Sequence, residues 1–94
     1  MSASIIYASD LFLVSDYPNG DVQVSFLYDS DDGLTRGAKW FIAAAAQQVR
    51  EIVAQTKVTM VDSLLLRRCN LDRAEIHRGI TADTQAPASV LDIC

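Results

Sequence analysis

The fold is decided by the stretch Val22-Gln23-Val24-Ser25-Phe26-Leu27-Tyr28. Large apolar side chains alternate here with smaller or polar ones, a period of two that is typical of a β-strand with one face against a core. We therefore expect the side chains of Val22, Val24, Phe26 and Tyr28 to point together toward the core.

A run of turn-forming residues, Asp16-Tyr17-Pro18-Asn19-Gly20-Asp21, directly precedes this strand. Proline presets φ for the first turn position, and glycine supplies the left-handed residue that closes a type I turn with a bulge. Residues 4–15 are rich in β-branched and aromatic types, as strands are. The pattern predicts an antiparallel β-hairpin over residues 4–28.

The sequence after the hairpin predicts a loop over residues 29–37 and a long amphipathic helix over residues 38–56. Thr35 is a candidate N-cap. At 100° per residue, an apolar stripe forms that can pack on the core face of the hairpin. The stripe consists of Ala38, Phe41, Ile42, Ala45, Val49, Ile52, Val53 and Thr56.

The last third, residues 57–94, is open to two interpretations. Val58 to Val61 fits a third strand, whereas Val61, Leu64, Leu65 and Cys69 fit helical spacing, with Asp62 or Ser63 as a cap. Asn70 can cap a further short helix over residues 71–78, ending at Gly79. We favour two short helices. The predicted fold class is therefore α+β: one domain over residues 1–94, with the hairpin packed on one long helix, followed by short helices or a third strand.

The composition favours a cytoplasmic protein with no membrane partner. The N-terminus lacks the basic and apolar regions of a signal peptide, and no apolar stretch approaches the roughly 20 residues that a bilayer requires. Cys69, Cys94 and one histidine do not form a zinc-binding pattern. We expect no metal, no cofactor and reduced thiols; a Cys69–Cys94 disulfide is the minor alternative.

Charge is unevenly distributed along the chain. Residues 1–32 hold six acidic residues and no lysine or arginine, whereas the rest is mildly basic, within a net charge of −4. Blocks of one sign steer association, so the acidic third predicts a surface for a protein partner that is basic. The alternative is that these aspartates serve only as turn residues. The predicted partner-binding residues are Asp16, Asp21, Asp29, Asp31, Asp32 and Trp40.

Trp40 is included because it falls on the polar side of the predicted helix, and tryptophan is enriched among interface hot spots. Its alternative is packing beneath the loop over residues 29–37 or against the C-terminal third. The acidic run from Asp29 to Gly33 departs from a calcium-binding loop, since its glycine comes one position early and no glutamate closes it.

The C-terminal third offers arginines and a histidine. Arg67, Arg68, Arg73 and Arg78 alternate with acidic residues, which favours local ion pairs, and the acidic net charge argues against direct nucleic-acid binding. His77 has no nucleophile placed beside it by a motif, so we predict no catalytic residues and no enzyme activity.

Three functions follow, in order of preference. The first is a non-catalytic protein-binding module, an inhibitor or adaptor, for instance a viral anti-defence protein such as an anti-CRISPR. The second is a structural subunit that forms homo-oligomers, joined through opposite charges and the apolar segment Val90-Leu91-Asp92-Ile93. The third is a small enzyme or enzyme subunit around His77.

Overall fold

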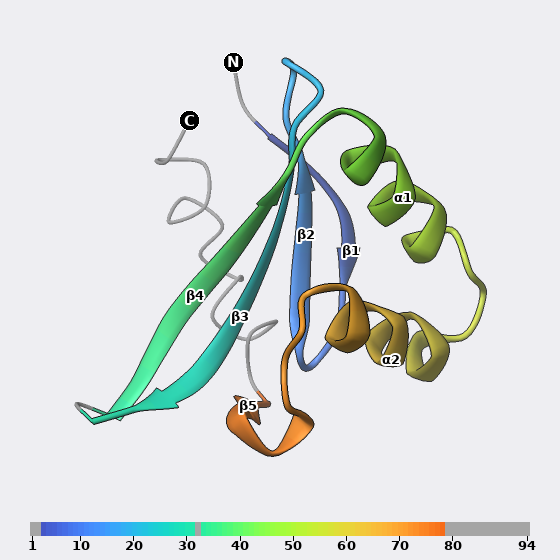
Figure 1. The fold of residues 1–94 in the computed structure, drawn as a ribbon. Helices are drawn as coiled ribbons and strands as arrows, with labels where there is room; N and C mark the ends of the chain where they lie inside the picture. The colour runs from blue at the N-terminus through green and yellow to red at the C-terminus, as the bar shows by residue number, and fades with distance from the viewer. Residues whose placement is uncertain (1–2, 32, 79–94) are drawn as a thin grey trace.

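The central strand of the molecule is β3 (Val22–Ser30), which has neighbours on both edges. The computed structural model describes residues 3–31 and 33–78 (Figure 1). Within them an antiparallel sheet has the order β1-β2-β3-β4, and the short β5 pairs with the end of β3 beyond β2. The other elements are β1 (Ser4–Ala8), β2 (Phe12–Asp16), β4 (Gly33–Phe41), α1 (Ala43–Val53), α2 (Val58–Arg68), the 3₁₀ turn η1 (Arg73–Glu75) and β5 (Ile76–His77).

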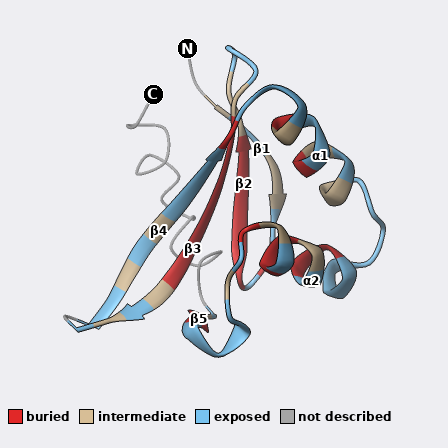
Figure 2. Ribbon diagram, viewed as in Figure 1, coloured by how far each residue is buried: buried red, intermediate tan, exposed pale blue. Residues whose placement is uncertain are grey.

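The chain is thus α+β, as predicted, but two helices rather than one long helix cover one face of the sheet (Figure 1). Their buried residues, including Val49 and Leu65, share one apolar core with the sheet. Val22, Val24 and Phe26 belong to this core and Tyr28 packs against it, which confirms the predicted core face of the strand. The central strands β2 and β3 are buried along most of their length (Figure 2).

The turn between β2 and β3 forms where the sequence predicts it. Gly20 has φ +94°, and its N–H donates to the carbonyl of Tyr17 at 2.9 Å. The strand expected over residues 4–15 is divided, however, into β1 and β2 by a turn at Ser9. The Ser9 hydroxyl accepts hydrogen bonds from the N–H groups of Leu11 and Phe12, each at 3.2 Å, and so satisfies the backbone inside this turn.

The predicted loop over residues 29–37 is wrong. Gly33, with φ +107°, closes a tight turn after Ser30, and the chain returns along β3 as β4. The Ser30 hydroxyl donates to the Gly33 carbonyl at 2.8 Å across this turn. Gly37 of β4 lies under the Phe26 ring, where a β-carbon would come within 2.8 Å of a ring carbon. Cross-strand packing, rather than alternation in the sequence, therefore makes this segment a strand.

The predicted helix start is wrong for the same reason. Residues 38–41 belong to β4, and Thr35 lies within that strand rather than capping a helix. Helix α1 begins at Ala43 after Ile42, which makes no side-chain cap. Because Ala43 has φ +51°, the junction from strand to helix passes through a left-handed residue that is not glycine.

After α1, the helical interpretation of residues 58–69 is confirmed, although α2 begins at Val58 rather than at Asp62 or Ser63. Asn70, with φ +57°, ends α2 instead of starting another helix. The N–H of Leu71 then reaches the carbonyl of Leu66 at 2.9 Å, as in a Schellman cap. The predicted helix over residues 71–78 is replaced by η1 and β5. The expectations for Gly79, for Cys94 and for the apolar segment at residues 90–93 lie outside the described residues.

Candidate protein interface

An aromatic pair, the exposed Trp40 and the partly buried Tyr17, lies at the end of the sheet where β2 turns into β3. The Trp40 ring lies 4.9 Å from the Tyr17 ring, tilted by 52°, and the Trp40 side chain is 49% exposed. Trp40 sits opposite Gln23 in the β3–β4 ladder, and the Tyr17 hydroxyl donates to the Gln23 side chain at 3.2 Å. Trp40 therefore lies on a strand, not on the polar face of a helix. Its side chain is exposed, yet strand pairing and the Tyr17 ring hold it in place.

The same end carries two of the predicted acidic residues. Asp16 pairs with Arg50 of α1, whose guanidinium donates to its carboxylate at 3.0 and 3.3 Å. Arg50 also donates to the Gly20 carbonyl at 2.6 Å, so it clamps the turn. Hydrogen bonding to Asp16 raises the pKa of Arg50. Asp21 is partly exposed and is hydrogen-bonded to Asn19. The net negative charge at this end is therefore small, since Arg50 offsets one of its two carboxylates.

The other predicted acidic residues lie at the opposite end of β3. At about 3.4 Å per residue, its nine residues separate the two ends by roughly 25–30 Å. Asp29 and Asp31 are both exposed there, while Asp32 lies outside the described residues. The predicted partner-binding residues thus form two groups, Asp16, Asp21 and Trp40 at one end, and Asp29 and Asp31 at the other. These residues therefore do not form a single acidic surface.

His77 contributes to the attachment of β5. Its Nε2 lies 2.9 Å from the Asp29 carboxylate, an ion-pair distance without hydrogen-bond geometry, and His77 faces Leu27 in the β3–β5 ladder. This contact joins the last described strand to the central one, which supports a structural role for the imidazole.

The sequence gives no sign of one buried polar group, centred on Asp62 of α2. A single carboxyl oxygen of Asp62 accepts hydrogen bonds from the Tyr7 hydroxyl at 2.7 Å and from the Ser9 hydroxyl at 2.8 Å. Burial, and then the hydrogen bond to Asp62, raise the pKa of Tyr7. These partners lie more than fifty residues apart in the chain, so no local pattern could have revealed them.

Cys69 is a free and buried thiol at the end of α2, and burial raises its pKa to about 11. In the two described ranges, no cluster of three histidine, cysteine, aspartate or glutamate residues is arranged to hold a metal ion. Among the residues that the structure describes, no helix is long and apolar enough to cross a bilayer. Comparison with family models, curated proteins and solved structures gives no match, so any function has to be argued from this geometry.

Proposed function

We propose that this chain is a non-catalytic protein-binding module, an inhibitor or adaptor, that contacts its partner through the Tyr17–Trp40 pair. One observation carries the proposal: a tryptophan that is half exposed is nevertheless held in place by a ring contact and by strand pairing. A pre-positioned aromatic side chain loses little conformational freedom on binding, which is why such residues act as interface anchors.

The aspartates at this end have a secondary role in the proposal. Because Arg50 already pairs with Asp16, Asp21 is the carboxylate that adds most to attraction of a basic partner. Such rim charges mainly raise the association rate and make it sensitive to salt. The aromatic pair contributes most of the affinity.

The test is a pull-down with tagged protein from nuclease-treated host lysate, followed by mass spectrometry and measurement of the Kd of the recovered partner. We expect Trp40→Ala to weaken binding at least tenfold, about 1.4 kcal/mol, as at a hot spot. Leu34→Ala is the matched control, since Leu34 is an exposed apolar residue at the far end of the same strand. Equal effects of the two substitutions would contradict the proposal.

The acidic part of the proposal is tested by comparing the two ends of β3. Asp21→Lys is expected to slow association at low salt more than Asp31→Lys, because Asp21 lies at the end that carries Trp40. A larger effect of Asp31→Lys would indicate that the interface lies at the other end of β3. A partner that handles nucleic acid would support the anti-defence form of the inhibitor.

Self-assembly is the second candidate. Arg67, Arg73 and Arg78 remain exposed and could meet the acidic turns of another copy. Light scattering after gel filtration in low and high salt tests this directly. A salt-sensitive oligomer would favour self-assembly, and a monomer in both buffers would exclude it.

A further inference from the structure

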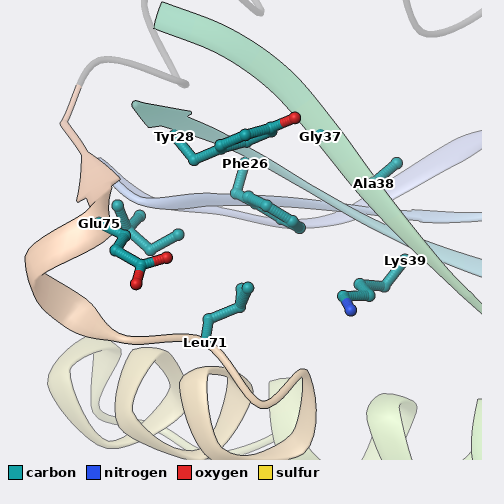
Figure 3. A pocket seen from close by; sticks show the side chains of 8 residues that line it. Phe26, Tyr28, Gly37, Ala38, Lys39, Leu71 and Glu75 are labelled. Carbon is teal, nitrogen blue, oxygen red and sulfur yellow. The ribbon is translucent and has the colours of Figure 1, made fainter. Parts of the chain in front are cut away.

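A cavity of about 330 Å³ lies beside the middle of β4, on the face of the sheet that the helices cover (Figure 3). The rings of Phe26 and Tyr28, with centroids 6.0 Å apart, form one wall. Leu71 lies across from them, at the end of the link that follows α2. The Lys39 and Glu75 side chains extend toward the space from opposite sides (Figure 3). The lining residues are Phe26, Tyr28, Gly37, Ala38, Lys39, Leu71, Glu75 and Ile76.

The cavity adjoins an open strand edge. Within the described residues, β4 pairs with β3 alone, although it runs for nine residues from Gly33 to Phe41. On the free edge of such a strand, every second residue turns its backbone N–H and C=O outward without a strand partner. The cavity-lining residues Gly37, Ala38 and Lys39 lie in the middle of this edge.

The positive charge of β4 favours one kind of added strand over another. The strand carries Arg36 and Lys39 and no acidic residue, in a chain whose net charge is −4. A second copy that paired through β4 with Lys39 opposite its own counterpart would bring like charges together, and like charges directly opposite each other are destabilising. An acidic strand would be complementary instead.

We propose that β4 binds an extended, acidic segment of a partner protein, which adds to the sheet as a further strand. An apolar side chain of that segment enters the cavity against Phe26, Tyr28 and Leu71, while a carboxylate two residues along, on the same face of the strand, pairs with Lys39. Backbone hydrogen bonds supply affinity in this mode and the side-chain pocket supplies specificity. The inference rests on the proposed protein-binding function but uses the edge of β4 and the face that carries the cavity, opposite to the face of Trp40, so each can fail separately.

The probe is a capped synthetic peptide of repeating Leu-Thr-Glu-Thr, in which leucine and glutamate lie on the same face of an extended strand, compared with one of repeating Leu-Thr-Lys-Thr. Binding is followed through amide chemical shifts in ¹⁵N-labelled protein and through the fluorescence of Trp40, the single tryptophan, which lies on β4. We expect the acidic peptide to shift the amide signals of β4 selectively and the basic peptide to leave them unchanged.

Two variants of the cavity should act in opposite directions. Lys39→Glu should weaken binding of the acidic peptide about fivefold to tenfold, and Glu75→Gln should strengthen it a few-fold by removing a like charge. Lys57→Glu is the matched control, because Lys57 is an exposed lysine at the start of α2, outside the cavity. All three positions are exposed, so folding should be unaffected.

Several results would overturn the inference. These are absence of β4 shifts with the acidic peptide, equal binding of the basic peptide, and equal effects of Lys39→Glu and Lys57→Glu. None of them would bear on Trp40→Ala in the pull-down, so failure of the strand-addition mode remains distinguishable from failure of the proposed function.

Discussion

Each of the two helices holds one turn of the sheet with one polar or charged side chain, but in different surroundings. From α1, Arg50 reaches the turn between β2 and β3, where its guanidinium and its partner Asp16 are each about one third exposed. From α2, Asp62 reaches the turn between β1 and β2, where it and Ser9 are buried. The same kind of clamp should therefore contribute far more to stability at α2 than at α1, since water competes with only one of them.

The largest effect is expected from Asp62→Ala. Truncation leaves the hydroxyls of Tyr7 and Ser9 without their shared acceptor, so the free energy of unfolding should fall by about 2–4 kcal/mol. Urea denaturation measures this loss. Asp62→Asn is the control, because it keeps a carbonyl oxygen as acceptor and should recover most of the stability. An alanine variant as stable as the original chain would contradict the expectation that Asp62 stabilises the fold more than Arg50 does.

Two buried serines sharpen the comparison within the sheet. Ser9 accepts two backbone hydrogen bonds and donates to Asp62, whereas the Ser15 hydroxyl is buried and has no hydrogen-bond partner among the described residues. Ser9→Ala should cost about 1–3 kcal/mol, and Ser15→Ala should be neutral or stabilising by up to about 1 kcal/mol. Thermal unfolding of the pair would show this, and similar losses in both variants would contradict it.

Alkaline pH should lower the free energy of unfolding through Cys69, the buried thiol at the end of α2. Burial raises the pKa of Cys69 from its ordinary value of 9.0 to about 11, so the folded state retains a proton that the unfolded chain releases earlier. The stability that this provides is complete below about pH 9 and is lost as the pH rises toward 11, by about 1–2 kcal/mol. Unfolding curves at several pH values should show the decline. Cys69→Ala should flatten the decline below about pH 10, the ordinary pKa of tyrosine, above which Tyr7 also contributes because its pKa is raised. An unchanged slope below about pH 10 in that variant would assign the decline to other groups.

The smallest effect is expected from Arg50→Met, which keeps an apolar stem and removes the charge at α1. The melting temperature should fall slightly at low salt, and the difference should shrink at high salt because exposed pairs are screened. The loss in Asp62→Ala should be nearly independent of salt. If both variants responded equally to salt, the contrast in burial would not explain their behaviour.

Sequence reasoning located the parts of the fold that depend on neighbouring residues. The turn at Pro18 to Gly20 and the alternation along β3 are both local, and both predictions are confirmed. Strand β4 was missed because its residues from Arg36 to Trp40 do not alternate clearly, and pairing with β3 overrides helix propensity there.

The candidate site shows the same limit. The prediction named Trp40, but on a helix, and the Tyr17 ring that positions it became visible only once β4 was placed beside β3. The acidic residues could be counted from the sequence, but their division between two ends of β3 depends on the length of that strand. The cavity beside β4 is formed by segments that are distant in the chain, so composition could not reveal it.

The position of β5 also bears on how the protein is made. Because β5 pairs Leu27 with His77, the far end of the central strand gains this neighbour only after some fifty further residues have been synthesised. At the usual 5–20 residues per second, the ribosome takes about 3–10 s to reach that point. Early in this interval, before α1 and α2 have been synthesised, the nascent hairpins expose a strand edge and an apolar face. This face is therefore open to chaperones, and to aggregation, before the helices cover it.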